Sequence, residues 1–156
     1  MKKTVFTGMA TALVTPMTQT GIDYDAFGRF IDFQIDSGIN ALVVNGTTGE
    51  NATIEPEDQA KVIRYTVEKV AKRVPVIAGT GTNNTEHVLH NTKNACEAGA
   101  DAVLVVTPYY NKATQNGLIR HFTAVADAST VPVILYNVPG RTGCNLLPKS
   151  VAVLAE

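Results

Sequence analysis

The sequence predicts an α/β protein that forms part of a (β/α)8 TIM barrel, and three observations lead to this fold class. Five short apolar runs, each the length of one strand, recur at intervals of about 30 residues. The runs are continuous rather than alternating, as expected for parallel strands buried on both faces. Helical patterns lie between them. The predicted strands cover residues 9–14, 41–44, 75–78, 102–106 and 132–135.

The first predicted helix follows the first strand and has clear boundary signals. Phe27, Ile31 and Ile35 recur every four residues, which places them on one face of a helix. Asp23 precedes this stripe and can cap the free amides of the first turn. Gly38 follows it and suits the left-handed conformation that ends many helices. We therefore expect a helix between Asp23 and Gly38.

Four more helices are predicted in turn after the later strands. One begins near Pro56, because proline is favoured in a first turn. Another lies between Thr85 and Gly99, a third contains residues 121–125, and Pro148 opens a last one. The apolar stripes of the first two of these helices are Ala60, Ile63, Val67 and Val70, and then Val88, Thr92, Ala95 and Cys96.

A weak internal repeat favours a barrel over an open sheet. Residues 38–44 resemble residues 99–105, and residues 74–77 resemble residues 131–134, so that alternate strands are alike. Alternate strands of a barrel fill the same interior layers. A doubly wound sheet would place a glycine-rich phosphate turn after an early strand, and no such motif is found. Since a barrel needs eight units in about 250 residues, we expect residues 1–156 to be the N-terminal portion of one barrel domain, with the remaining units absent from this chain.

Composition restricts the partners and the location of the protein. The chain has 13 Lys and Arg against 14 Asp and Glu, a net charge of −1, without a basic cluster. This balance argues against nucleic-acid binding and against an anionic membrane surface. No apolar run approaches the roughly 20 residues of a membrane span. Cys96 and Cys144 form no disulfide framework, so we expect reduced cysteines and a cytoplasmic protein.

Chemistry in a parallel barrel belongs to the loops after the strand C-termini. Gly46 and Gly49 let backbone amides approach a small anion such as a carboxylate, although the same residues also suit an ordinary turn. The Arg141 guanidinium can bind a carboxylate or form a surface salt bridge. Tyr136 ends a strand, where a tyrosine can be catalytic or structural. These loops cover residues 15–16, 46–50, 79–83, 107–111 and 136–141.

Several other kinds of active site are disfavoured. His87, His90 and His121 fall on predicted helices without the spacing of metal ligands, so we expect no metal site and place all three on solvated helix faces. No Ser/His/Asp or Cys/His set converges on the strand ends. Glu50 is nearly alone there as an acid, which argues against a glycosidase with two carboxylates.

Three motifs in order resemble the dihydrodipicolinate synthase family. They are Gly-Thr-Thr-Gly-Glu at 46–50, Thr-Pro-Tyr-Tyr-Asn at 107–111 and Tyr-Asn-Val-Pro-Gly-Arg-Thr-Gly at 136–143. The resemblance extends over essentially the whole chain. A wider superfamily of Schiff-base aldolases, including N-acetylneuraminate lyase, shares parts of these motifs. Arg141 after Tyr-Asn-Val-Pro-Gly favours the synthase.

The resemblance implies a lyase reaction in lysine and diaminopimelate biosynthesis. Pyruvate forms a Schiff base with a lysine, and its enamine condenses with L-aspartate 4-semialdehyde to give 4-hydroxy-tetrahydrodipicolinate, without a cofactor. The family's proton relay matches Tyr136, Thr47 and Tyr110. Thr48 matches a residue that binds pyruvate, and Arg141 matches one that binds the semialdehyde. The family's lysine would lie past Glu156, so this chain alone is expected to be inactive.

The resemblance also implies assembly and regulation. Tyr110 would reach a neighbouring subunit's site, in a homodimer within a homotetramer. Feedback-inhibited members bind L-lysine with residues matching Asn51, Ala52, Asn83, His87 and Tyr109, together with Pro56 and Gln59. Histidine stands at position 87 where some members carry a glutamate, and neutral histidine is a poor partner for an ammonium group. We therefore expect weak inhibition by L-lysine, or none.

Two alternative functions remain open from the sequence. The first is another pyruvate-dependent aldolase such as N-acetylneuraminate lyase, for which replacement of Arg141 would matter little. The second is a non-catalytic fragment that acts as an assembly module. A reading frame that continues into a strand ending in lysine would argue against the second.

Overall fold

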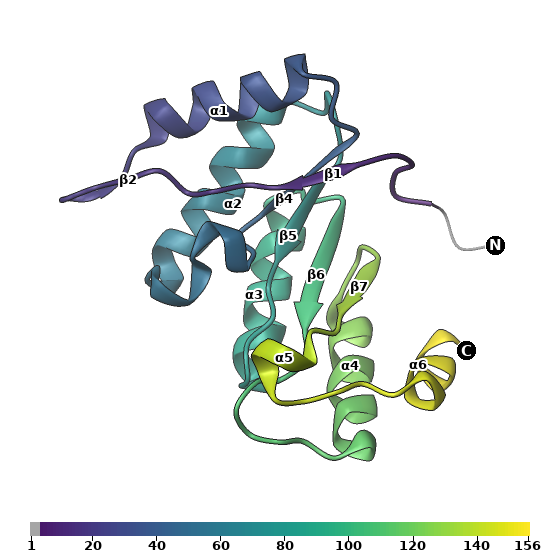
Figure 1. Ribbon diagram of the computed structural model, residues 1–156. Coiled ribbons are helices and arrows are strands. Elements are labelled where there is room, and N and C mark those ends of the chain that lie inside the picture. Colours follow the sequence, from purple (N-terminus) through teal and green to yellow (C-terminus); the bar gives the residue numbers. More distant parts are fainter. Residues whose placement is uncertain (1–3) are drawn as a thin grey trace.

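The computed structural model describes residues 4–156, which contain a parallel sheet of five strands in the order β1-β4-β5-β6-β7. The strands lie where the apolar runs predict them, with ends shifted by a few residues. Figure 1 shows that β6 and β7 run toward the short helix α5 at their carboxyl ends. The sheet is thus the consecutive parallel arrangement expected for part of a barrel. Its strands are β1 (Ala10–Ala12), β4 (Ala41–Val44), β5 (Val76–Gly79), β6 (Ala102–Val106) and β7 (Val133–Tyr136).

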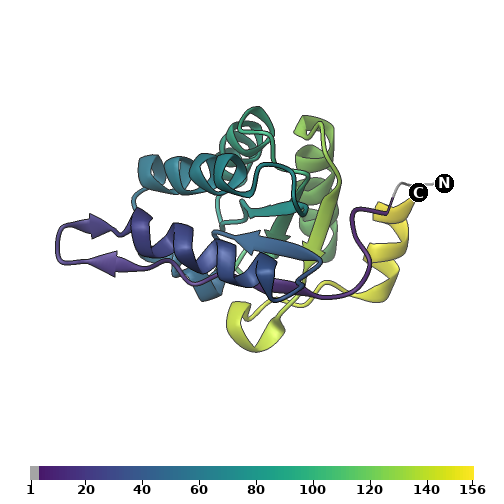
Figure 2. The ribbon, with the colours of Figure 1, turned by 90° about the horizontal axis from the view of Figure 1, so that it is seen from above.

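Four long helices connect the strands and pack against one another in chain order, as Figure 2 shows. Asp23 caps α1 as predicted, because its carboxylate accepts the Ala26 amide. The start of α3 corrects the prediction by one residue. Thr85 is its first residue, and Asn84 is the cap that accepts the amides of Glu86 and His87. The helices are α1 (Tyr24–Asp36), α2 (Pro56–Val70), α3 (Thr85–Glu97) and α4 (Gln115–Ala128).

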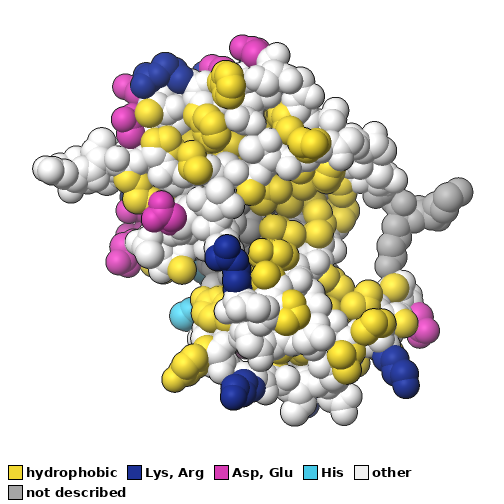
Figure 3. All heavy atoms as spheres, in the orientation of Figure 1, with side chains coloured by type: hydrophobic (Ala, Val, Ile, Leu, Met, Phe, Trp, Pro, Cys, Tyr) yellow, Lys and Arg dark blue, Asp and Glu magenta, His cyan; other side chains and the backbone are white. Residues whose placement is uncertain are grey.

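The two faces of the sheet are buried differently. Leu42, Val44 and Val103 belong to the large core between the sheet and the helices. Ala41 and Ile77 point to the opposite face, which corresponds to the interior of a barrel. Part of the apolar surface remains open, as the yellow area at the centre of Figure 3 shows.

Several short elements were missed by the sequence patterns. Strands β2 (Met17–Thr18) and β3 (Gly21–Ile22) form a two-stranded hairpin that is too short for any periodicity. The turns η1 (Thr47–Gly49) and η2 (Asn51–Thr53) lie between β4 and α2. Helix α5 (Pro139–Thr142) occupies a segment that was expected to be a loop. The final helix α6 (Pro148–Ala155) begins at Pro148 as predicted.

The internal repeat has a conformational basis. Gly38 follows α1 with φ 86°, and Gly99 follows α3 with φ 88°. Both values lie in the left-handed region that glycine adopts without strain. Each glycine therefore ends a helix and starts the short turn into the next strand.

His121 corrects the expectation of a solvated helix face. The side chain lies between α3 and α4 and is only 5% exposed. Its Nδ1 is 2.9 Å from the Thr85 hydroxyl, whereas its Nε2 has no hydrogen-bond partner within residues 4–156. Burial lowers the pKa of His121, because the charged imidazolium loses hydration there. His87 and His90 are exposed.

Two further features of residues 4–156 bear on the sequence analysis. Cys96 and Cys144 are both free thiols. No helix in this range has the length and apolarity to cross a membrane.

Candidate active site

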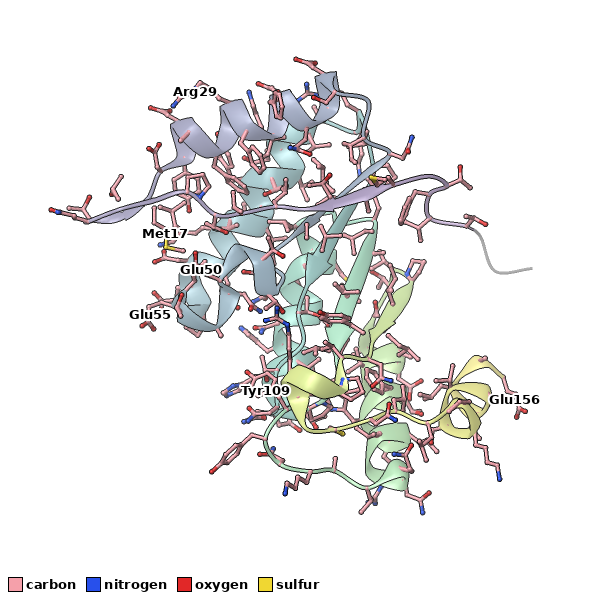
Figure 4. All side chains as sticks on the ribbon, in the orientation of Figure 1. Met17, Arg29, Glu50, Glu55, Tyr109 and Glu156 are labelled. Carbon is pink, nitrogen blue, oxygen red and sulfur yellow. The ribbon has the colours of Figure 1, made fainter. Side chains whose placement is uncertain are left out.

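A cavity of about 260 Å³ lies at the carboxyl ends of the parallel strands. Its walls come from segments that are far apart in the sequence, because parallel strands bring their carboxyl ends to one edge of a sheet. Tyr109 lies beside α5 in this region, as Figure 4 shows. The lining residues are Asn45, Gly46, Thr47, Asn51, Ala52, Gly79, Gly81, Leu104, Val106, Tyr109, Tyr136, Val138, Arg141 and Thr142.

The cavity brings together three of the predicted site residues, Thr47, Tyr136 and Arg141. Thr47 follows β4, Tyr136 ends β7, and Arg141 lies on α5. Thr48 is exposed and does not line this cavity, and Tyr110 does not line it either. Within a single copy of the chain, Thr47 and Tyr136 therefore line the same cavity, whereas Thr48 and Tyr110 lie outside it.

Arg141 gives the cavity its electrostatic character. It is the one charged residue among the lining residues, and neither Asp nor Glu is among them. Within the described part of the chain, the Arg141 side chain forms no ion pair. A guanidinium without a protein partner beside apolar walls favours a carboxylate ligand.

Residues 46–53 form the segment that carries Thr47, which we call the threonine loop. Glu50 joins its two 3-10 turns in the left-handed region with φ 56°. The Thr15 hydroxyl donates to the Gly49 carbonyl at 2.9 Å. A Cβ atom on Gly49 would lie 3.1 Å from the Leu13 carbonyl oxygen, so the loop packs closely on β1 and its following residues.

Asn45 connects the threonine loop to the neighbouring strand. Its side chain is 2% exposed, and its Nδ2 donates to the Gly79 carbonyl at 3.0 Å. The same nitrogen lies 3.4 Å from Oε1 of Gln59 on α2. The Asn45 Oδ1 atom is buried without a hydrogen-bond partner in residues 4–156.

Two glycines let the strand ends approach closely. A Cβ atom on Gly79 would lie 2.2 Å from the Asn45 carbonyl oxygen. A Cβ atom on Gly81 would lie 2.4 Å from the Val106 amide nitrogen. Both distances are too short for a side chain, so residues 79–81 form a close-packed strand end.

The β7 side of the cavity is fixed by hydrogen bonds around Thr142. The Thr107 amide donates to the Tyr136 carbonyl at 3.0 Å, continuing the ladder past the end of β6. The Thr142 hydroxyl donates to the Cys144 carbonyl at 2.9 Å and is buried. These contacts hold α5, and with it Arg141, at the rim.

Tyr110 lies outside the cavity and is 87% exposed. Its backbone has φ 71°, and its amide donates to the Thr142 carbonyl at 3.2 Å. It lines a neighbouring cavity of about 400 Å³ that shares Tyr109, Arg141 and Thr142 with the first. A tyrosine held outward by its own backbone is available to another molecule.

A third cavity, of about 460 Å³, contains all the residues predicted to bind an inhibitor. Its walls come from the threonine loop, the start of α2 and the segment before α3. Asn51, Ala52, Gly81 and Tyr109 line both this cavity and the first one. The predicted set within it is Asn51, Ala52, Pro56, Gln59, Asn83, His87 and Tyr109.

Some lining residues were missed by the sequence analysis. Leu104 and Val106 form apolar walls, and the alternation of side chains along β6 could have indicated them. Asn45 has φ 59°, which directs its side chain away from the expected alternation. Only the Asn-Gly pair at 45–46 could have indicated this backbone conformation.

The chain is similar to known proteins of one family. The profile of the Dihydrodipicolinate synthetase family matches residues 5–156. The 4-hydroxy-tetrahydrodipicolinate synthase of Acetivibrio thermocellus is 56% identical over 156 residues, which is 100% of this chain and 53% of that protein.

Two solved structures are similar in fold and sequence. The chloride-inhibited dihydrodipicolinate synthase from Acinetobacter baumannii, complexed with pyruvate, has a TM-score of 0.95 and 45% identity over 98% of this chain and 53% of that one. The enzyme from Aquifex aeolicus has a TM-score of 0.94 and 46% identity over 95% of this chain and 50% of that one. The chain spans about half the length of the relatives it matches. With a family match over nearly all its residues, the chain belongs to the dihydrodipicolinate synthetase family.

Proposed function

We propose that the chain supplies the proton-transfer and carboxylate-binding part of a 4-hydroxy-tetrahydrodipicolinate synthase. In the whole enzyme, pyruvate would condense with L-aspartate 4-semialdehyde through a Schiff base, without a cofactor. The lysine that forms this Schiff base would lie outside the 156 residues, in the remaining units of the barrel. The chain alone would then be inactive.

One observation carries the proposal. Thr47 and Tyr136 are 89 residues apart in the sequence and still line one cavity, with Arg141 as its single charge. Three relatives that match 97–100% of this chain at 52–56% identity are named as this synthase. A pair of hydroxyl groups beside a guanidinium suits a small substrate that carries a carboxylate.

The chemistry requires proton transfer at defined atoms. An amine adds to the keto carbon of pyruvate, and the carbinolamine oxygen must gain protons to leave as water. The methyl group then loses a proton to give the enamine, whose carbon attacks the aldehyde. Tyrosine has an ordinary pKa near 10 and is a weak base at neutral pH. We propose that Tyr136 and Thr47 pass these protons along a hydroxyl chain, with Tyr110 as the third member.

Arg141 and Thr48 would bind the substrate carboxylates. Arg141 already stands at the cavity rim and would hold the carboxylate of the semialdehyde. Thr48 would donate to the carboxylate of pyruvate. Its exposed position means that this contact needs an adjustment of the threonine loop or the presence of the rest of the barrel.

Assembly would complete the relay. Tyr110 is exposed and held away from its own cavity, so we propose that it reaches the site of a second copy in a homodimer or homotetramer. The third cavity would be the regulatory site. We propose that L-lysine binds there weakly, since a neutral histidine stands at position 87 and Glu55 is the one carboxylate among the lining residues.

A hydroxyl-deletion experiment tests the proposed function. In the longer enzyme that contains this chain, we expect Tyr136→Phe to lower kcat for condensation at least about 100-fold, because it removes the relay hydroxyl and little volume. The control is Tyr65→Phe, which removes a hydroxyl bonded to the Tyr24 carbonyl at 2.7 Å between α1 and α2. Its kcat should stay unchanged. Full activity of Tyr136→Phe would contradict the proposal.

A second substitution distinguishes the synthase from another pyruvate aldolase. Arg141→Ala should raise the KM for L-aspartate 4-semialdehyde at least about tenfold, since a charged hydrogen bond is lost. The KM for pyruvate should change less. An unaffected reaction with the semialdehyde, together with cleavage of a sialic acid, would instead identify a lyase such as N-acetylneuraminate lyase.

A further inference from the structure

Asn45 stands directly before the threonine loop, and none of the recognised motifs assigns it a role. Its backbone lies in the left-handed region with φ 59°, and its side chain is 2% exposed. Asparagine tolerates this conformation better than other residues with a side chain, apart from aspartate. The residue thus turns the chain out of β4 and into Gly46.

The orientation of the Asn45 amide is fixed by its two acceptors. Nδ2 donates to the Gly79 carbonyl at 3.0 Å and lies 3.4 Å from Gln59 Oε1. The reverse orientation would place Oδ1 against the Gly79 carbonyl oxygen, which is also an acceptor. In the orientation observed, Oδ1 is buried without a partner in the described chain. An unsatisfied acceptor makes this residue a poor choice for stability alone and points to a functional reason.

Gln59 continues the connection to the loop. Its Nε2 donates to the Asn51 carbonyl at 2.7 Å and to the Ile54 carbonyl at 2.9 Å. One line of amides therefore runs from the end of β5 through Asn45 and Gln59 to the far end of the threonine loop. That loop contributes Gly46, Thr47, Asn51 and Ala52 to the cavity.

We propose that Asn45 is a positioning residue that holds the threonine loop, and so the Thr47 hydroxyl, in place at the cavity wall. The proposal rests on the proposed function, because it states how one member of the relay is fixed. A hydroxyl relay needs heavy-atom distances of about 2.6–3.2 Å. The loop consists of two 3-10 turns, and the contacts to β5 and α2 fix it in addition to the Thr15 hydroxyl, which donates to the Gly49 carbonyl. Asn45 acts through Thr47 and need not touch a substrate.

Two substitutions of Asn45 in the longer enzyme separate its side chain from its backbone. Asn45→Gly keeps the positive φ and removes both donated hydrogen bonds. Asn45→Asp keeps the size and replaces the donors with an acceptor. For each, we expect kcat to fall by about 10- to 100-fold, because a small displacement of a reacting group has effects of this size. The KM for pyruvate should change much less than kcat.

Gln59→Glu provides a second route to the same loop. It removes the donations to Asn51 and Ile54, so kcat should fall by a similar factor. The double variant with Asn45→Gly should lose less than the product of the two single losses, because both act through one network. Asn94→Asp is the matched control, since the Asn94 side-chain amide lies 3.0 Å from His90 Nε2 on the exposed side of α3, away from the threonine loop. Its kcat should equal that of the wild type.

Hydrogen exchange gives a readout that does not depend on turnover. Asn45→Gly should speed amide exchange in residues 47–53, whereas Asn94→Asp should leave exchange there unchanged. Unchanged kcat and exchange in Asn45→Gly would overturn the proposal, and so would reduced unfolding stability with wild-type kcat. If the wild-type enzyme failed to condense pyruvate, the proposed function would be wrong. That result would leave the positioning role of Asn45 to the exchange experiment, in which unchanged amide exchange of residues 47–53 in Asn45→Gly would reject it.

Discussion

At the scale of single residues, position at a strand end was the most informative property. Thr47, Tyr136 and Arg141 were predicted at the ends of two strands, β4 and β7, and they line one cavity. Asn45 and Gln59 could not be connected from the sequence, because their contact depends on a left-handed backbone and on how α2 packs. Thr48 and Tyr110 show the same limit, since the motif gives their identity and only the fold gives their direction.

His121 leads to a prediction about pH. Burial lowers the pKa of His121 in the folded chain, whereas in the unfolded chain it should have the ordinary value of about 6.5. At pH values between these two pKa values, the unfolded chain therefore binds more protons than the folded chain. The free energy of unfolding should therefore decrease as the pH falls below about 6.5, and this contribution should be absent above it. His121→Asn, which can still bond to Thr85, should reduce the slope.

The measurement is urea unfolding at several pH values between about 7.5 and 5.5. His90→Asn, on the exposed side of α3, is the matched control and should keep the wild-type slope. An identical slope in His121→Asn and in the wild type would show that His121 does not titrate in this way.

At the scale of elements, long patterns were predictable and short ones were not. The five strands and the helices with stripes and caps were predicted from periodicity, proline and glycine. The β2–β3 hairpin has two residues in each strand, and α5 has four residues, so neither leaves a periodic signal. The turns η1 and η2, which follow β4, and the short helix α5, which follows β7, nevertheless carry residues of the site, because they lie at strand ends.

The junction of β4 and β5 leads to a prediction about stability. Gly79→Ala would place a Cβ atom 2.2 Å from the Asn45 carbonyl oxygen, a backbone atom that cannot rotate away. We expect a loss of at least about 1–3 kcal/mol in the free energy of unfolding, because the strands must separate. Urea denaturation measures this loss.

Gly140→Ala serves as the control for that substitution. A Cβ atom at Gly140 would meet nothing within 4 Å. Its unfolding free energy should stay within about 0.5 kcal/mol of the wild type. Equal effects of the two substitutions would contradict the close approach at Gly79.

At the scale of the whole molecule, the sheet has open edges at β1 and β7. Met9, beside β1, is 70% exposed, and apolar residues are visible at the centre of Figure 3. The relatives are about twice as long as this chain. The order of the motifs predicted the family, and the periodicity predicted the barrel. Neither could predict the geometry of the site, because we propose that further strands and a second copy of the chain complete it.

The central claim is that this cavity serves a Schiff base whose lysine lies outside these 156 residues. Treatment with pyruvate and borohydride, followed by mass spectrometry, tests it most directly. The chain alone should gain no adduct, and the longer enzyme should carry one adduct on a lysine beyond residue 156. A trapped adduct on Lys112, Lys149 or any other lysine of this chain would contradict the account.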